Sequence, residues 1–336
     1  MTDTNKTWVL AEHPTGMPDA GTFRLEERAI PDIADGQVLG RSRWLSVDPY
    51  MRGRISKQAN YAGGVSIGEA MHGAAVAEVV ESRHPDWKPG DLFETIGFGW
   101  RDYAAVPGDG LTRVDTSIDA PEHAWLSYLG MPGLTALIAM DTIGKVKKGQ
   151  TVLVSAASGA VGQVVGQIAK IRGARAVAVA SSAEKLDWCR QIGFDEGINY
   201  RTAPNLGRAV AEACPGGVDV FFDNTAGPIH DAAMNNLALG ARVIICGTIS
   251  LAGQFEAPDM GERFLRKILV ARARMEGFLI FDHVAKYPAA RRQLAQWAAD
   301  GKLTFKTDIL DGIEQMPTAF LNLLTSQNFG KQVVRV

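Results

Sequence analysis

Cysteine, long apolar runs and an excess of charge of either sign are all scarce in this 336-residue sequence. The three cysteines, Cys189, Cys214 and Cys246, are far apart and have no C-x-x-C spacing. They are too few for a disulfide framework or a four-thiolate zinc site, and they suit a reducing compartment. No uninterrupted apolar stretch approaches the roughly 18 residues that span a bilayer, and the N-terminus has no apolar signal region. We therefore expect a cytoplasmic protein with no membrane partner.

The charge balance excludes another class of partner. The 35 Lys and Arg residues against 37 Asp and Glu residues leave a net charge of −2. This balance offers no electrostatic basis for binding nucleic acid. Hydrophobic residues make up 46% and charged residues 21%, as in ordinary soluble globular proteins. The length exceeds that of a single core, so we expect two domains.

Metal ligands are also scarce in the first half of the chain. No cysteine precedes Cys189, and His13, His72, His84 and His123 have no paired spacing on a helix. A catalytic zinc in a dehydrogenase takes Cys and His ligands. We therefore expect no metal site.

The first part of the chain has the pattern of a β domain. Short β-like runs broken by glycine, proline and aspartate extend from Trp8 to about Val114, which predicts a mostly antiparallel sheet, in the form of a small barrel. Residues 122–143 change to helical spacing of apolar positions and mark the passage between domains. The "MPG" at 131–133 is expected to break this segment into two helices.

After Gly149, apolar strands alternate with helices. The strand-like runs are "TVLVSA", "RAVAVAS", "VDVFFDN" and "ARVIICG". This alternation predicts a doubly wound parallel sheet with helices on both faces, in a Rossmann-like α/β domain. The tail from about Tyr287 is expected to pack back on the N-terminal domain. We predict a substrate domain at residues 1–125, completed by 290–336, and a dinucleotide-binding domain at 126–289.

The stretch "VSAASGAVGQ" (154–163) resembles a dinucleotide-binding turn that lacks its first glycine. Ala157 stands at that position, whereas Gly159 and Gly162 are present. The glycines of such a turn let the backbone approach the pyrophosphate and let the helix pack closely, with the phosphates at the helix N-terminus. An apolar strand precedes the turn and an amphipathic helix follows it, so we predict dinucleotide binding.

A carboxylate is missing where an NAD-selective site would have one. About 20 residues beyond the glycines, Asp or Glu ordinarily accepts a hydrogen bond from the ribose 2′-hydroxyl. Here the sequence is Ala180-Ser181-Ser182-Ala183, with Glu184 in the first turn of the helix that follows and Lys185 just beyond. Hydroxyls, a cation and helix N–H groups are suited to a 2′-phosphate, so NADPH is the predicted cofactor. The two serines also fit a helix N-cap, which is compatible with phosphate binding.

Motifs along almost the whole chain resemble one known family. Their combination and order are similar to those of the zinc-independent medium-chain dehydrogenase/reductases, in the branch of leukotriene B4 12-hydroxydehydrogenase/prostaglandin reductases and curcumin and alkenal double-bond reductases. The segments that carry the resemblance are "LSVDPYMRGRI" (45–55), "GFGWRDYAAVP" (97–107), "LGMPGLTA" (129–136), "VSAASGAVGQVVGQIAKIRGA" (154–174), "GFDEGINY" (193–200), "VDVFFDNTAG" (218–227), "CGTIS" (246–250), "EGFLIFDH" (276–283) and "NFGKQVV" (328–334).

The resemblance implies a GroES-like, mostly antiparallel β-barrel domain beside the Rossmann-like domain, with the active site in the cleft between them. It implies NADPH-dependent reduction of a carbon–carbon double bond conjugated to a carbonyl (enones and enals), in a homodimer. The implied cofactor contacts are Gly159, Ala160, Val161 and Gly162 at the pyrophosphate; Ser182, Lys185 and Tyr200 at the 2′-phosphate; Asn224, Cys246 and Thr248 at the adenosine and ribose; Phe278, Ile280, Met131 and Thr135 at the nicotinamide; and Asn328 closing the site.

One position departs from this family. A tyrosine expected two residues after the serine of "CGTIS" is replaced by Ala252, which cannot donate a proton. Enone reduction needs a donor for the charge that develops on the carbonyl oxygen. Three donors stay open: Tyr61, which matches a tyrosine of the bacterial curcumin reductases; Tyr50, on a loop that the family uses at the cleft; and the nicotinamide ribose 2′-hydroxyl.

Two other functions also stay open at this point. One is an NADPH quinone reductase of the ζ-crystallin type, which turnover of 1,4-quinones but not of enones would favour. The other is a catalytically weak NADPH-binding sensor or scaffold, which is suggested by Ala252 in place of the family tyrosine.

Overall fold

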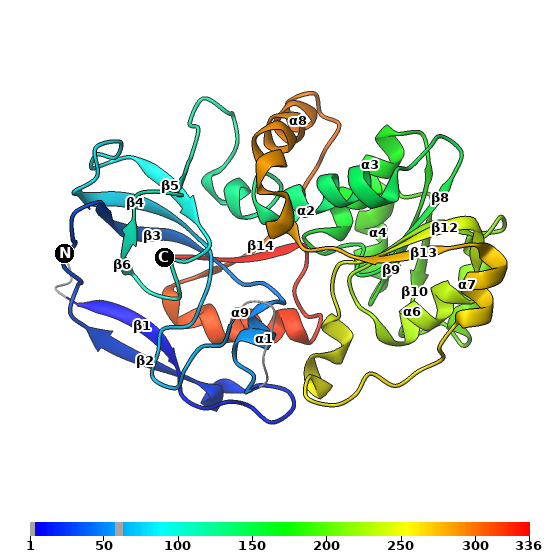
Figure 1. Cartoon of the computed structure of the whole chain (residues 1–336), viewed down its shortest axis with the longest axis horizontal. Helices are drawn as coiled ribbons and strands as arrows, with labels where there is room; N and C mark the ends of the chain where they lie inside the picture. The colour runs from blue at the N-terminus through cyan, green and yellow to red at the C-terminus, as the bar shows by residue number, and fades with distance from the viewer. Residues whose placement is uncertain (1–3, 58–62) are drawn as a thin grey trace.

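A computed structural model describes residues 4–57 and 63–336 of the chain. Two lobes lie side by side, each built on its own sheet, and the chain passes from the N-terminal lobe to the second lobe and back (Figure 1). The predicted residue Tyr61 falls outside the described ranges.

The N-terminal lobe contains a seven-stranded sheet and a two-stranded hairpin. The sheet has the order β14-β15-β3-β4-β5-β7, with β6 paired to β3. Its early strands pair antiparallel and are β3 (Gln37–Ser46), β4 (Ala75–Ser82), β5 (Leu92–Thr95), β6 (Tyr103–Pro107) and β7 (Thr112–Arg113). The hairpin joins β1 (Asn5–Leu10) to β2 (Phe23–Arg28) through the 3-10 turn η1 (Ala20–Thr22).

The C-terminal tail completes this lobe. Strand β15 (Lys331–Arg335) pairs antiparallel with β3, and β14 (Thr307–Asp311) pairs parallel with β15. Between them, η6 (Ile313–Gln315) and α9 (Met316–Leu324) pack into the same hydrophobic core as β3 and β4. The short helix α1 (Met51–Arg54) follows β3 and joins that core.

The second lobe is a six-stranded parallel sheet of order β10-β9-β8-β11-β12-β13. Its strands are β8 (Thr151–Val154), β9 (Arg175–Ala180), β10 (Glu196–Asn199), β11 (Val218–Asp223), β12 (Leu237–Ile245) and β13 (Arg274–Gly277). The helices between them are α3 (Gly162–Ile171), α4 (Ala183–Gln191), α5 (Leu206–Ala213), α6 (Gly227–Met234) and α7 (Leu265–Ala271).

Both faces of the parallel sheet are buried, which explains the continuous apolar runs of its strands. Val152 and Val154 of β8 pack in one core cluster with Ile168 of α3, whereas Leu153 packs in another with Val210 of α5. A strand covered on both sides has no polar face to alternate with. The predicted fold class, a doubly wound parallel sheet beside a mostly antiparallel β domain, is confirmed.

The passage between the lobes is broken just before the predicted "MPG". A 3-10 turn, η2 (Glu122–Leu126), is followed by α2 (Met131–Ala139) and a short π-helical turn, η3 (Met140–Gly144). A Cβ at Gly130 would lie 1.9 Å from the Trp125 carbonyl oxygen, and one at Gly133 would lie 1.9 Å from that of Tyr128. The two glycines therefore allow η2 to fold tightly against the start of α2.

One of the hydrophobic clusters spans both lobes. The cluster that contains α2 and α3 extends to Val76 of β4 and Val333 of β15 in the N-terminal lobe. Helix α8 (Tyr287–Ala299), preceded by the turn η5 (Ile280–Lys286), also packs on α2. In the described part of the chain, no helix combines the length and the apolar character needed to cross a membrane.

A buried ion pair fastens the last strand to the turn after β3. Lys331 is 1% exposed and Asp48 is 4% exposed. The Lys331 ammonium donates to Asp48 Oδ1 at 2.7 Å, to Ser46 Oγ at 2.7 Å and to the Val47 carbonyl at 2.8 Å. All three N–H donors of the lysine are thus satisfied, as burial of a charge requires.

We predict that Lys331→Met lowers the free energy of unfolding by about 3–5 kcal/mol, because it leaves the Asp48 carboxylate buried without its cation. Urea denaturation followed by tryptophan fluorescence measures this change. Lys302→Met is the matched control, since Lys302 pairs with Asp300 at the surface, and it should cost less than about 1 kcal/mol. Equal small effects of both variants would contradict the prediction.

Candidate cofactor and substrate site

The turn between β8 and α3 is shaped by the carbonyl of Ala156. Ala156 has a left-handed backbone with φ of +47°. A Cβ at Gly162 would lie 2.3 Å from the Ala156 oxygen, and one at Gly159 would lie 3.1 Å from it. Gly162 is therefore required for the helix to begin this close to the strand.

The missing first glycine has a structural explanation. The positive φ falls on Ala156, one residue before Ala157. Ala157 itself is fully buried, and its N–H donates to the Val179 carbonyl at 3.1 Å. Its methyl group therefore packs inside the sheet and needs no special backbone conformation.

The turn fits the pyrophosphate of a dinucleotide. Gly159, Ala160, Val161 and Gly162 lead directly into α3. The N–H groups of Gln163, Val164 and Val165 donate back to the Gly159 and Val161 carbonyls, so the N–H groups that the terminus offers to a ligand are the ones just before them. Such a terminus attracts phosphate through its N–H groups and its dipole. Small side chains and glycines leave room for the backbone to approach the ligand.

The residues predicted for the 2′-phosphate meet at the ends of β9 and β10. Asn199 of β10 is paired with Ala180 of β9, and the Tyr200 N–H donates to the Ala180 carbonyl at 3.2 Å. Ser182 caps α4, and its hydroxyl accepts from the Lys185 N–H at 3.3 Å. Ser182, Lys185 and Tyr200 are therefore held at one edge of the sheet.

The residues predicted for the adenosine and ribose follow β11 and β12, beside the point where the strand order reverses between β8 and β11. Asn224 donates its N–H to Ser155 Oγ and its side-chain amide to the Ser155 carbonyl, both at 2.8 Å. Cys246 follows β12, and its N–H donates to the Asp223 carbonyl at 2.8 Å. Thr248 is exposed just before the 3-10 segment η4 (Ile249–Gln254). Ligands of open parallel sheets bind at such a reversal.

Cys246 is not an activated nucleophile. Burial raises the pKa of its thiol to about 12, and the nearby Asp223 carboxylate acts in the same direction. The thiol therefore stays protonated near neutral pH, which fits a cofactor neighbour better than a covalent role.

The residues predicted for the nicotinamide come from α2 itself and from the segment that follows β13. Phe278 and Ile280 follow β13 with buried side chains, and the Phe278 N–H donates to the Ile245 carbonyl at 3.0 Å. Their side chains belong to the core, so only their backbone is available to a ligand. Thr135 is buried on α2, and Met131 at its start lines a small cavity with Ser46, Asp48, Ala74, Glu94, Trp125, Leu126 and Pro132.

Asn328 lies on the turn between α9 and β15. Its side-chain amide donates to the Gly330 carbonyl at 3.0 Å, and the Phe329 N–H donates to Asp308 Oδ2 at 3.0 Å. The turn is therefore ordered from within the tail.

Tyr50 stands at the start of α1 beside a histidine that sequence spacing did not single out. The Tyr50 hydroxyl lies 3.2 Å from His72 Nδ1, with the two rings edge to face. Burial lowers the pKa of His72 to about 4, and the Arg54 guanidinium contributes in the same direction. The imidazole is therefore neutral near pH 7, and it can either accept from the phenol or donate to it. Tyr61, the other predicted tyrosine, lies outside the described residues.

Ala252 is part of the N-terminal lobe's core, although it follows β12 in sequence. It is 3% exposed, and its carbonyl accepts from Arg52 Nε at 2.8 Å. Arg52, itself buried, also pairs with Glu256 at 3.2 Å. A tyrosine at position 252 on the same backbone would have to displace this packing.

Within residues 4–57 and 63–336, no three His, Cys, Asp or Glu side chains are grouped closely enough to hold a metal ion together.

Two family models match the chain. Residues 6–114 match the N-terminal domain of oxidoreductases, and residues 160–299 match the family described as zinc-binding dehydrogenase. Together they cover both lobes.

Several relatives match over nearly the whole length. The NADPH-dependent curcumin reductase of Escherichia coli is 40% identical, covering 99% of this chain and 97% of that protein. The NADP(+)-dependent 2-alkenal reductase of Nicotiana tabacum is 36% identical, covering 99% and 97%. The crystal structure of CurA from Vibrio vulnificus in complex with NADPH has a TM-score of 0.93 and 38% identity, covering 98% and 99%.

Identity at this level along the full chain, together with the shared fold, establishes common descent. The chain belongs to the zinc-independent branch of the medium-chain dehydrogenase/reductases that contains the prostaglandin reductases and the curcumin and alkenal double-bond reductases.

Proposed function

We propose that this chain reduces the carbon–carbon double bond of α,β-unsaturated aldehydes and ketones, with hydride from NADPH and without a metal. The proposal is carried by the dinucleotide turn at Ala156–Gly162, in a chain that is similar end to end to a curcumin reductase and a 2-alkenal reductase. The predicted cofactor, NADPH, is confirmed by the NADPH dependence of these relatives and the NADPH complex of CurA.

The bound cofactor supplies the hydride that the β-carbon of the alkene receives. The chain's own part is to hold the pyrophosphate at Gly159–Gly162 and the 2′-phosphate at Ser182, Lys185 and Tyr200. The α2 residues Met131, which is partly buried, and Thr135, which is buried, would flank the nicotinamide with the backbone of Phe278 and Ile280. Asn224, Cys246, Thr248 and Asn328 would complete the pocket. A rigid pocket of this kind orients the reacting atoms before the reaction.

A hydroxyl donor must stabilise the enolate oxygen that forms during the reaction. Two tyrosines are our candidates, Tyr61 and Tyr50. Tyr50 has geometric support, because its phenol oxygen lies 3.2 Å from Nδ1 of His72, an imidazole that burial keeps neutral near pH 7. The same phenol would then deliver its proton, directly or through water, as the α-carbon is protonated.

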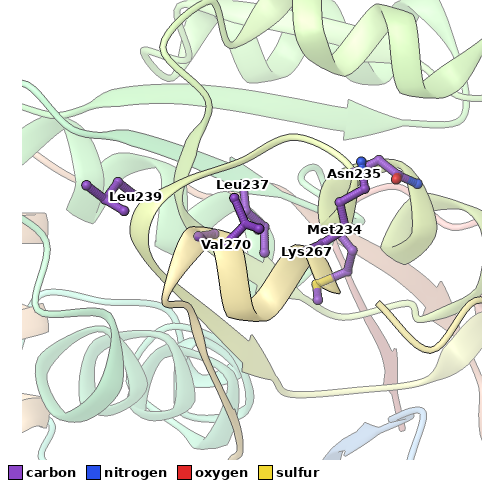
Figure 2. A pocket seen from close by; sticks show the side chains of 7 residues that line it. Met234, Asn235, Leu237, Leu239, Lys267 and Val270 are labelled. Atoms are coloured by element: carbon purple, nitrogen blue, oxygen red, sulfur yellow. The ribbon is translucent and has the colours of Figure 1, made fainter. Parts of the chain in front are cut away.

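We further propose that the chain forms a homodimer along the edge strand β13. All four residues of β13 are exposed at the end of the sheet. Beside it, α7 exposes Leu265, Leu269 and Val270, of which Leu269 is 74% exposed. Figure 2 shows Val270 beside a hollow that Met234, Asn235, Leu237, Leu239, Lys267 and Ala271 also line. An unpaired strand edge beside exposed apolar side chains suits a second copy, which would pair with β13 and cover α7.

We also propose the domain boundaries and the cellular location that the sequence predicts. The division into residues 1–125 with 290–336, and 126–289, is supported by the sheet to which each strand belongs. A cytoplasmic location is supported by the free thiols of Cys189, Cys214 and Cys246.

The function is tested by measuring NADPH oxidation at 340 nm with purified protein and a panel of enals, cyclic and aryl enones, and 1,4-quinones. We expect turnover of enals or enones with a saturated carbonyl product. Turnover of quinones alone would favour a quinone reductase. Tight NADPH binding with no turnover across the panel would favour a sensor or scaffold.

Lys185→Ala should raise the KM for NADPH by at least about 10-fold and leave the KM for NADH nearly unchanged, because a charge-assisted contact to the 2′-phosphate is lost. Lys170→Ala is the control, because Lys170 pairs with Asp195, which follows the C-terminal end of α4, whereas Ser182 caps its N-terminal end. This substitution should change neither KM. Equal effects of Lys185→Ala on both cofactors would remove the assignment.

Tyr50→Phe should lower kcat at least about 10-fold with little change in the KM for NADPH, because a proton donor is lost. Tyr61→Phe is measured in parallel. A lower kcat in Tyr61→Phe alone would identify Tyr61 as the proton donor. An unchanged kcat in both variants would leave the 2′-hydroxyl of the nicotinamide ribose as the remaining candidate.

Leu269→Glu should convert a dimer to a monomer, because a charge would be buried in the proposed interface. Analytical ultracentrifugation measures the mass. Ile67→Glu, at an exposed site of the N-terminal lobe, is the control and should leave the dimer intact. A wild-type protein that sediments as a monomer would rule the dimer out.

A further inference from the structure

Two cations meet at the C-terminal end of α9. The Lys185 ammonium donates to the Ser326 carbonyl at 2.7 Å, and Arg201 Nη2 donates to the Thr325 carbonyl at 3.4 Å. These carbonyls belong to consecutive residues, so the ammonium and the guanidinium lie side by side. They come from different elements, since Lys185 is in the first turn of α4 and Arg201 follows β10.

The carbonyls explain only part of this arrangement. The end of a helix carries partial negative charge, and Ser326 turns the chain in a left-handed conformation with φ of +59°. Within the described residues, however, neither Lys185 nor Arg201 forms an ion pair with a carboxylate. Glu184 is exposed, and Asp308 already accepts the Phe329 N–H.

Like charges held this close repel each other. Burial lowers the pKa of Lys185, and repulsion from the Arg201 guanidinium lowers it further. The acids Asp308 and Glu184 act in the opposite direction without removing the effect. A bound anion would relieve the repulsion and satisfy the free N–H groups of both side chains.

The position of the two cations indicates which anion. Arg201 directly follows Tyr200, and its guanidinium lies 5.9 Å from the centre of the Tyr200 ring. The paired strand ends at Asn199 and Ala180 bring Arg201 and Ser182 to the same edge of the sheet. This is the edge that faces the adenosine ribose of a dinucleotide in such a fold.

We propose that Arg201 is a second cation for the 2′-phosphate of NADPH and that it helps to determine the preference for NADPH over NADH. Lys185 keeps one N–H on Ser326 and offers the other two, whereas Arg201 offers the rest of its planar guanidinium. The proposal rests on the proposed use of NADPH and adds a residue to that site.

The experiment is isothermal titration of the full chain with 2′,5′-ADP, which carries the 2′-phosphate, and with ADP, which lacks it. Arg201→Ala should raise the Kd for 2′,5′-ADP at least about 10-fold and change the Kd for ADP less than about twofold. Arg201→Lys should have an affinity for 2′,5′-ADP between those of Arg201→Ala and the wild type, because lysine keeps the positive charge but lacks the planar guanidinium with its paired N–H donors. Arg208→Ala is the control, since Arg208 is exposed on α5 and pairs with Glu212.

A 2′,5′-ADP affinity within about twofold of the wild type in Arg201→Ala would overturn the proposal. So would an equal loss for both nucleotides, or a wild-type chain that binds 2′,5′-ADP no more tightly than ADP. The titration contains no alkene, so it tests the role of Arg201 separately from the proposed reaction. If Arg201→Ala selectively loses affinity for 2′,5′-ADP but the wild-type chain reduces no enone, only the proposed reaction is contradicted.

Discussion

The close approach of the Ala156 carbonyl to Gly162 is the constraint on which the cofactor half depends. A side chain at Gly162 would overlap the backbone of the preceding turn, so α3 could not begin directly after β8. Because the helix begins there, its N-terminal N–H groups meet the carboxyl ends of the parallel strands. Ser182, Tyr200, Asn224, Cys246 and Phe278, which are predicted to hold other parts of the cofactor, follow those same strand ends. One steric contact thus places the phosphate site and the sheet edge around it together.

The two lobes are joined by contacts between residues that are far apart in sequence. The Lys331–Asp48 pair fixes the last strand to the turn after β3, and Arg52 holds the segment around Ala252 to the N-terminal lobe. A common apolar core from β4 through α2 to β8 fills the space between them. The loop with Tyr50 and the helix with Met131 are therefore positioned by packing that neither lobe provides alone.

Charge is distributed differently at the two ends of the proposed cofactor site. At the adenosine end, Lys185 and Arg201 lie together without a carboxylate partner in the described chain, which suits the extra phosphate of NADPH. Beside Tyr50, burial keeps His72 neutral. The neutral imidazole can orient the phenol by a hydrogen bond without adding a charge of its own, and the Arg54 guanidinium lies 5.9 Å from the centre of the Tyr50 ring.

Local patterns in the sequence determined much of this description. The alternation of apolar strands with helices predicted the parallel sheet. The spacing of Gly159 and Gly162, with no acid within Ala180–Ala183, predicted NADPH. These features depend on residues close in sequence, where backbone geometry and periodicity are enough. Only the tertiary structure decided that Ala156 carries the left-handed turn, that His72 contacts Tyr50, that Ala252 lies in the other lobe's core, and that Arg201 stands beside Lys185. Each of these depends on segments that long-range packing brings together, and no spacing within a single segment encodes such a contact.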